Sequence, residues 1–151
     1  MMVYLFLIHI LLNSWQGQFA CQEATPYRLC YTAQAIMMEE SSVCRNMIGD
    51  DGSSLGCMQV SLGAVRRLFP GYPRRAWKKL VGEDALNISV GVSYLHWCIQ
   101  RMKSWARGVV CYNAGPSFAR NLTPWQVNHF PYLQAVIGYV RELERKEPDK
   151  T

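Results

Sequence analysis

The segment AIMMEESS at residues 35–42 is followed, after a polar loop, by GSSLGCMQV at residues 52–60, and this pair decides the interpretation of the whole sequence. The apolar start of residues 35–42 is typical of a buried helix, whose end then carries two carboxylates and two hydroxyls. The Gly- and Ser-rich start of the second segment predicts a turn that brings Met58 and Gln59 back toward that helix end. A carboxylate held beside apolar groups is suited to act as a general acid, so we expect a catalytic site here.

Helical patterns continue along most of the remaining sequence. Thr25-Pro26 predicts a helix start, because Pro is favoured at the first helical position. The expected helices span residues 25–40, 62–69, 74–81, 84–102, 105–113 and 131–146, with a short turn after Thr123. No strand alternation is convincing apart from a short hairpin around residues 48–60. The sequence therefore predicts a mainly α, single-domain fold.

Residues 1–20 resemble an export signal. The apolar run at residues 3–12 is shorter than the roughly 18 residues that span a bilayer, and the small Ala20 is suited to a cleavage position. An uncleaved membrane anchor is the alternative, because no Lys or Arg precedes Arg28. We therefore expect a signal or anchor at residues 1–20, the catalytic domain at residues 21–147 and a charged tail at residues 148–151.

The cysteines agree with export. All six lie beyond residue 20, and an oxidising compartment favours disulfides, although the sequence does not choose their pairing. Cys57 and Cys111 lie in apolar stretches, so each could be a small, unpaired core residue instead of half of a disulfide. No two cysteines have metal-site spacing and only two histidines lie beyond residue 20, so no metal is expected.

The net charge of +5 comes from 16 Lys and Arg against 11 Asp and Glu, which suits an anionic polymer or surface as partner. The sequence has no zinc-finger spacing, aromatic RNA-binding signature or basic heptad arm, so nucleic acid is not an expected partner. A basic cluster at residues 66–79 is usually a solvated face, with attraction to an anionic envelope as the functional alternative.

Four blocks carry a family resemblance when they are taken in order. They are Glu40-Ser41, Gly56-Cys57-Met58-Gln59, the segment CYNAG at residues 111–115, and Tyr132 in the last helix. Together they resemble the catalytic domain of the soluble lytic transglycosylase (SLT) family, over residues from about 25 to about 145. The resemblance implies a goose-type lysozyme-like fold. It also implies cleavage of the β-1,4 bond between N-acetylmuramic acid and N-acetylglucosamine in peptidoglycan, with a 1,6-anhydro product and no metal or organic cofactor.

The resemblance also implies a role for each matched residue. Glu40 is the single catalytic acid, whereas Glu39 points about 100° away on a helix and is read as a solvated residue. The residues expected to bind the sugar are Ser41, Met58, Gln59, Tyr112, Asn113 and Tyr132. The expected partner is the peptidoglycan strand, together with an envelope-spanning secretion, conjugation or pilus machine, or a phage. The expected location is the periplasm, with membrane contact only through an uncleaved N-terminus.

Three alternatives stay open. A second carboxylate at Asp50 or Asp51 would make the chain a lysozyme-like hydrolase that uses water. The segment GSSLG at residues 52–56 matches the elbow of serine hydrolases, although the strand and helix context of that motif is missing. A protein that binds glycan strands without cleaving them, as an assembly factor, is the non-enzymatic alternative.

Overall fold

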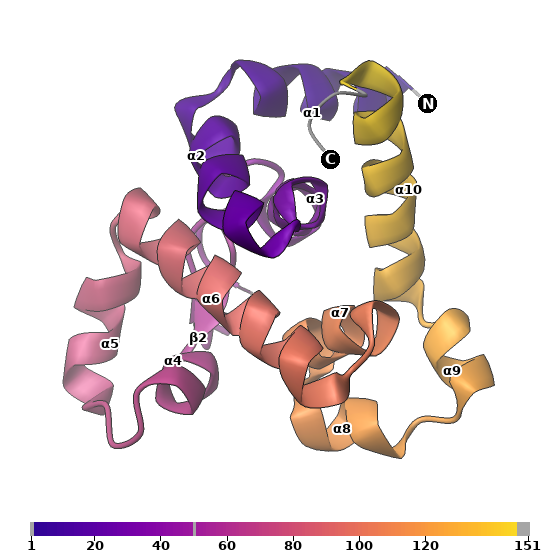
Figure 1. The fold of residues 1–151 in the computed structure, drawn as a ribbon. Helices are drawn as coiled ribbons and strands as arrows, with labels where there is room; N and C mark the ends of the chain where they lie inside the picture. Colours follow the sequence, from indigo (N-terminus) through magenta and orange to yellow (C-terminus); the bar gives the residue numbers. More distant parts are fainter. Residues whose placement is uncertain (1, 50, 148–151) are drawn as a thin grey trace.

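A computed structural model describes residues 2–49 and 51–147, and the helix that ends near Glu40 lies at its centre. Helix α3 (Cys30–Ser41) has every side chain of residues 30–38 buried, so it presents no solvent face along most of its length. It packs against α1 (Met2–Asn13), α2 (Trp15–Ala24) and α10 (Pro131–Lys146), as Figure 1 shows. A helix that is apolar all round is stable only inside such a bundle.

A second long helix, α6 (Asp84–Met102), connects the two sides of the molecule and crosses Figure 1 diagonally. It packs against α2, and against α4 (Leu62–Leu68) and α5 (Arg74–Val81) on one side. On the other side it packs against α7 (Trp105–Ala114). Gly108 permits this close approach, because a Cβ there would lie 2.6 Å from the Cα of Ile99.

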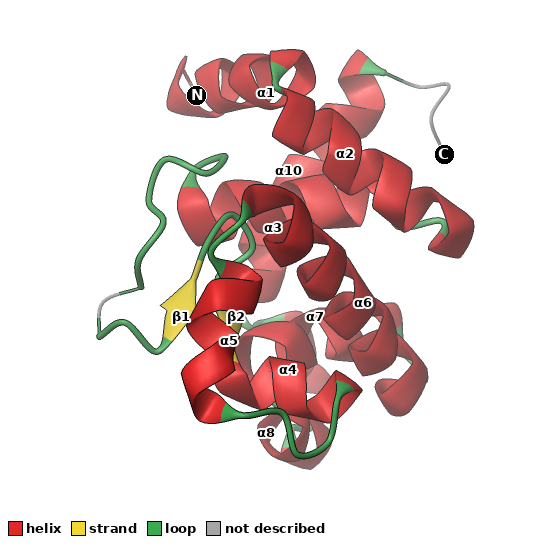
Figure 2. Ribbon diagram, turned by 90° about the vertical axis from the view of Figure 1, so that its left-hand side faces the viewer, coloured by secondary structure: helices red, strands yellow, loops and turns green. Residues whose placement is uncertain are grey.

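The expected hairpin is confirmed, and it is short. Strands β1 (Ser54–Leu55) and β2 (Val60–Ser61) pair antiparallel, and Figure 2 shows them beside the loop that follows α3. Ser61 then caps α4 by accepting a hydrogen bond from the Ala64 N–H. The pairing of the two strands thus places the turn between them, residues 56–59, beside the end of α3.

Two helix predictions are wrong in detail. The helix expected at residues 25–40 is interrupted: a 3₁₀ turn at Thr25–Tyr27 ends at Arg28, whose φ of 58° is left-handed, and α3 begins only at Cys30. Pro26 starts the 3₁₀ turn and not the long helix. After Gly115, Pro116 starts an unpredicted helix, α8 (Pro116–Asn121), and α9 (Pro124–Asn128) follows with a complete capping box. Pro116, which follows the end of α7, thus begins the next helix.

All six cysteines form disulfides, each between neighbouring segments. Cys21–Cys30 joins α2 to α3, Cys44–Cys57 joins the loop after α3 to the hairpin turn, and Cys98–Cys111 joins α6 to α7. Cys57 and Cys111 are therefore bridged, and both are also fully buried. Two of the bridges therefore hold the helix that carries Glu40 and the loop after it, and the third holds α6 to α7.

The N-terminal segment is helical and packs on the domain. Helix α2 runs without a break through Ala20 and Cys21, Ala20 is fully buried, and the Gln34 side-chain amide donates a 3.0 Å hydrogen bond to the Gly17 carbonyl. Cleavage after Ala20 stays a prediction, and it would remove residues 15–20 of α2. Within the described residues, no helix combines the length and apolarity needed to cross a membrane. The charged tail predicted at residues 148–151 lies outside the described residues.

Candidate active site

Glu40 lies in the last turn of α3, where it meets the start of α10. The Tyr132 hydroxyl, from the second residue of α10, donates a 2.6 Å hydrogen bond to Oε1 of Glu40. Helix α3 ends at Ser42, which has a left-handed φ of 51°, so the chain turns away and leaves the carboxyl group partly exposed. The structure thus brings together two predicted site residues that are far apart in the sequence.

Burial raises the pKa of Glu40 to about 7. The hydrogen bond from Tyr132 opposes this effect by stabilising the ionised carboxylate. The negative charge of the exposed Glu39 raises the pKa of Glu40 further. Met37 and Met58 are both fully buried beside this helix end, which supplies the apolar surroundings. A carboxyl group with a pKa near 7 is protonated in a large fraction of molecules at neutral pH, as a general acid requires.

Ser41 fixes the end of α3 and does not face an open sugar site. Its side chain is buried, and its hydroxyl lies 2.6 Å from the Cys57 carbonyl and 3.1 Å from that of Met37. The same oxygen accepts a 2.8 Å hydrogen bond from the Cys44 N–H. The predicted sugar contact of Ser41 stays a prediction, while its bonds here join the helix end to the hairpin turn.

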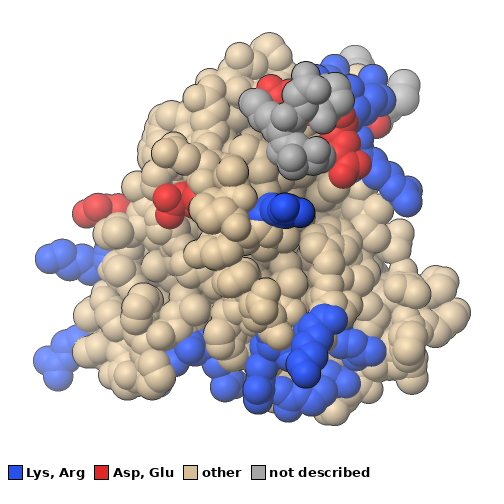
Figure 3. Space-filling model, viewed as in Figure 1, with Lys and Arg blue, Asp and Glu red and all other residues tan. Residues whose placement is uncertain are grey.

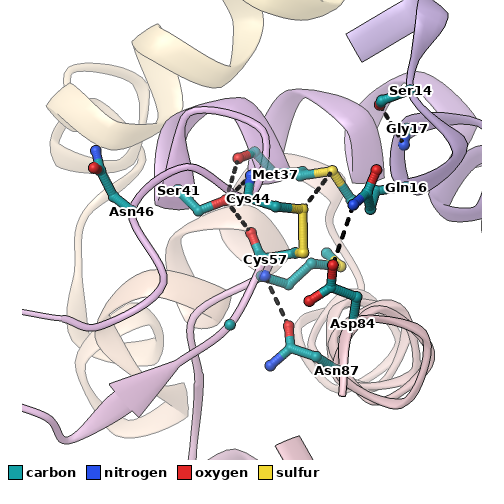
Figure 4. Close-up of a disulfide and its surroundings, with 12 residues drawn as sticks. Ser14, Gln16, Gly17, Met37, Ser41, Cys44, Asn46, Cys57, Asp84 and Asn87 are labelled. Carbon is teal, nitrogen blue, oxygen red and sulfur yellow. Dashed lines mark hydrogen bonds between the residues drawn. A yellow bond between two sulfur atoms is a disulfide. The ribbon is translucent and has the colours of Figure 1, made fainter. Parts of the chain in front are cut away.

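Asn87, on α6, holds the hairpin turn from the opposite side, as Figure 4 shows. Its fully buried amide accepts a 2.8 Å hydrogen bond from the Met58 N–H and donates to the carbonyls of Leu55 (2.7 Å) and Val81 (3.0 Å). Gly56 passes so close that a Cβ would lie 2.1 Å from the Asn87 amide nitrogen. The main chain of Met58 is therefore held by Asn87 of α6, and its side chain is held by the core around it.

Tyr112 joins this turn to α7. Its buried hydroxyl donates a 2.7 Å hydrogen bond to the Met58 carbonyl, and burial, with the nearby charge of Glu40, raises its pKa well above the usual value. Gly91 makes room for the contact, because a Cβ there would lie 2.7 Å from the Cβ of Met58 and 3.1 Å from the Tyr112 hydroxyl. The phenol thus supports the groove wall as a neutral donor.

Gln59 and Ser54 bond to each other inside the hairpin. The Ser54 hydroxyl donates a 3.0 Å hydrogen bond to the Gln59 side-chain oxygen, and the Gln59 amide nitrogen donates to the Gly56 carbonyl at 2.9 Å. The Ser54 proton is thus directed at an amide and not at a histidine, as a hydrolase nucleophile would require. The serine-hydrolase alternative therefore loses its support.

A hollow of about 200 Å³ opens beside Tyr112, between α4 and the junction of α7 with α8. Its lining includes three predicted residues, Gln59, Tyr112 and Asn113, and two that were not predicted, Arg67 and Tyr94. Glu40 and Tyr132 are not part of this lining. The candidate site therefore has an acid end, formed by Glu40, Ser41, Met58 and Tyr132, and a hollow, with Tyr112 shared between them.

Within the described residues, Asp51 and one group of possible metal donors do not form a second catalytic centre. Asp51 is exposed and accepts a 2.9 Å hydrogen bond from the Ser53 N–H, which stabilises a turn, and Asp50 lies outside the described residues. Donor atoms of Cys44, Cys57 and Asp84 lie within 4.8 Å of one another, yet the two sulfurs are bonded to each other and offer no thiolate. In the described part of the chain, Glu39 is the only carboxylate whose charge acts on Glu40.

Comparison with known families agrees with this geometry. Residues 19–124 match the model of the transglycosylase SLT domain, a range that holds Glu40, the hairpin turn, Tyr112 and Asn113. No curated protein and no solved structure matches the chain significantly. The matched range covers well over half of the sequence and the whole of the mainly α core from within α2 to the start of α9. The chain belongs to the transglycosylase SLT domain family, whose lysozyme-like domains cleave the glycan strands of peptidoglycan.

Proposed function

We propose that this chain is a lytic transglycosylase that cleaves the bond between N-acetylmuramic acid and N-acetylglucosamine with Glu40 as its only acid and base. The observation that carries the proposal is the Glu40 carboxyl group itself, which has a pKa of about 7 and a 2.6 Å hydrogen bond from Tyr132. Such a group can be protonated when it meets the substrate and can still ionise during the reaction.

Each proton in the proposed reaction passes through Glu40. The protonated carboxyl group donates to the glycosidic oxygen, and the bond from that oxygen to the anomeric carbon breaks through an oxocarbenium-like state. The resulting carboxylate then removes the proton from the 6-hydroxyl of the same muramyl residue. That oxygen bonds to the anomeric carbon and closes the 1,6-anhydro ring, which restores the carboxylic acid without using water.

The setting of Asp51 favours this route over hydrolysis, because this candidate for a second catalytic carboxylate is exposed and bonds to the Ser53 N–H within its own turn. A two-carboxylate glycosidase needs its second carboxyl group about 5 to 9 Å from the first. A substrate hydroxyl makes that group unnecessary, because the nucleophile is delivered by the sugar. A lysozyme-like muramidase that uses water, and a non-catalytic glycan-binding factor, are the competing functions.

We also place this activity outside the cytoplasm, in the periplasm. Three disulfides and the apolar N-terminal segment support export to an oxidising compartment. The setting that we propose is local wall opening for an envelope-spanning secretion, conjugation or pilus machine, or for a phage.

Mass spectrometry of the products released from purified peptidoglycan tests the proposal, with the full chain compared with Glu40→Gln. Muropeptides one water lighter than hydrolytic products are the expected result, and Glu40→Gln should lower their release by at least about a thousandfold. Ordinary reducing ends would instead identify a muramidase. No release by either protein would favour the binding factor.

A further inference from the structure

One cation faces the hollow. Arg67, in the last turn of α4, is exposed, and among the described residues that line this space it is the only one with a charged side chain. The remaining lining is apolar, aromatic or neutral and polar, and it includes Asn113. A single guanidinium in a neutral recess selects for a single negative group on whatever enters.

No carboxylate among the described residues forms an ion pair with the guanidinium of Arg67. Within residues 2–49 and 51–147, the ion pair that forms is Arg145–Glu142, on the exposed face of α10. The adjacent Arg66 behaves differently, because its Nε donates a 3.1 Å hydrogen bond to the Tyr72 carbonyl and so supports the turn after α4. Arg66 therefore has a structural partner, whereas the charge of Arg67 is left available to a ligand.

Aromatic rings connect Arg67 to the acid end. The guanidinium carbon lies 6.0 Å from the centroid of the Trp97 ring, and Trp97 stacks on Tyr94 at 5.8 Å. Tyr94 in turn packs against Tyr112 at 5.5 Å, and Tyr112 bonds to the Met58 carbonyl. Trp97, Tyr94 and Tyr112 thus pack as a row of rings from Arg67 toward Glu40, and Tyr94 and Tyr112 line the hollow although most of their surface is buried.

The charge of Arg67 also acts at short range on this row. Burial raises the pKa of Tyr94, and the positive charge of Arg67 opposes that rise. Figure 3 shows further Lys and Arg side chains gathered along the edge of the molecule where α4 and α8 lie in Figure 1, without Asp or Glu among them. An anionic polymer that approaches this edge would meet a positive potential before it reaches the hollow.

We infer that Arg67 determines substrate specificity by binding a carboxylate on the lactyl side of a muramyl residue seated in the hollow. This inference rests on the proposed function, because it takes peptidoglycan as the polymer. The carboxylate has two sources: the free lactyl group of a strand without peptides, or an acidic residue of the stem peptide. N-acetylglucosamine carries neither, so Arg67 would set which sugar of the alternating strand occupies the hollow.

Binding in the Glu40→Gln background tests this inference without cleavage. Binding would be measured by pelleting for intact peptidoglycan and by titration in solution for soluble strands stripped of peptides by an amidase, each with its carboxyl groups free or converted to neutral amides. Arg67→Gln should weaken binding to at least one of the free forms by roughly three- to tenfold. Amidation of the polymer should weaken binding of the parent protein by a similar factor. It should weaken binding of the Arg67→Gln protein little further.

The two polymers identify the source of the carboxylate. If Arg67→Gln weakens binding to the stripped strands, the carboxylate belongs to the lactyl group. If it weakens binding only to intact peptidoglycan, the carboxylate belongs to the stem peptide. Arg67→Lys should recover part of the binding, and Arg74→Gln, which removes one charge from α5 outside the hollow, should change it less than about twofold. Equal losses of binding from Arg67→Gln and Arg74→Gln would overturn the inference. Independent effects would also overturn it, that is, amidation that weakens binding of Arg67→Gln by the same factor as binding of the parent.

Failure of the proposed function would look different. A chain that binds these polymers through Arg67 but releases no anhydro products would overturn the proposed chemistry and leave the role of Arg67 intact. A chain that releases anhydro products equally well with Arg67 or Gln at this position, and binds equally well, would overturn the role of Arg67 alone. A chain that binds neither polymer would overturn both.

Discussion

The acid end and the hollow adjoin each other but differ in how their polar groups are satisfied. At the acid end, Glu40, Ser41 and the Met58 backbone all bond to protein groups. In the hollow, Gln59 and Tyr112 also bond to protein groups, but the side chains of Arg67 and Asn113 are exposed, and within the described residues neither of these two forms a hydrogen bond or an ion pair with another side chain. The acid end is fixed before the substrate arrives, whereas the hollow keeps two polar side chains that can bond to the substrate.

This difference follows from what each region must do. A general acid works only when its carboxyl group is held in one geometry and one protonation state, so its surroundings are built from internal hydrogen bonds and a disulfide. A polymer groove must release its product, so its polar groups remain solvated until a sugar replaces the water. Mutations at the acid end should therefore affect folding as well as chemistry, whereas those in the hollow should affect binding alone.

The largest expected effect separates the two regions through a matched pair of asparagines. Asn87→Ala leaves the Met58 N–H and the carbonyls of Leu55 and Val81 without their partner, and it should lower the free energy of unfolding by about 3 kcal/mol. Asn113→Ala, at the exposed wall of the hollow, should change it by less than about 0.5 kcal/mol. Urea unfolding of both variants measures the contrast. Equal losses would mean that the hollow is as constrained as the acid end.

The next largest effect concerns the stability contributed by Glu40. Its pKa of about 7 in the folded chain exceeds the ordinary value of 4.5, so the folded state binds more protons than the unfolded state between these pH values. The parent should therefore lose stability as the pH rises from about 4.5 to about 7. Glu40→Gln cannot ionise, and relative to the parent it should gain about 2 kcal/mol between pH 4 and pH 8. Thermal unfolding of both proteins at the two pH values measures this gain, and a gain at pH 4 as large as that at pH 8 would contradict it.

The rate of cleavage should follow the same ionisation. The protonated form of Glu40 is the active one, so kcat/KM should be constant in acid and should fall about tenfold for each pH unit above about 7. Release of soluble anhydro-muropeptides over a pH series measures this limb. Arg74→Gln serves as the control for general charge effects and should show the same limb as the parent. A limb near pH 4.5 would mean that Glu40 is not held in an apolar site.

The acid end could be predicted from sequence better than the hollow. Glu40 and Tyr132 are separated by 92 positions, and only their order among four family blocks connected them before the structure placed them 2.6 Å apart. Their chemistry is distinctive, because a carboxylate at the end of an apolar helix has few other uses. The family resemblance therefore predicted the site, while the helical periodicity of the sequence predicted most of the fold.

The supporting residues gave no comparable signal. Asn87 is a polar residue within a long helix and part of a glycosylation-like triplet, so its three buried hydrogen bonds depend on the hairpin lying against α6. Arg66 and Arg67 are neighbours in a basic run, and their different roles depend on which one meets the Tyr72 carbonyl. The disulfides were open for the same reason, since the choice among cysteine pairs is made by packing.

The break at Arg28 shows the limit of local rules. Thr25-Pro26 satisfies the pattern for a helix start, and a short 3₁₀ helix does start there. Two hydrogen bonds then close the turn, from the Arg28 N–H to the Thr25 carbonyl and from the Leu29 N–H to the Ala24 carbonyl. This turn lets α2 fold back on α3, with Cys21 and Cys30 bridged across it. Packing of α2 against the buried helix α3 thus prevailed over the local preference for one continuous helix at residues 25–40.

The smallest expected effect tests whether Tyr132 acts on Glu40 or only supports α10. Tyr132→Phe removes the hydrogen bond that favours the ionised carboxylate, so the pKa of Glu40 should rise and the alkaline limb of kcat/KM should move to higher pH. The carboxyl group also loses its restraint, and the rate in acid should fall roughly fivefold. Tyr27→Phe, on an exposed tyrosine stacked on His96, should change neither the rate nor the limb. A lower rate with an unmoved limb would show that Tyr132 serves the substrate and leaves the protonation of Glu40 to burial alone.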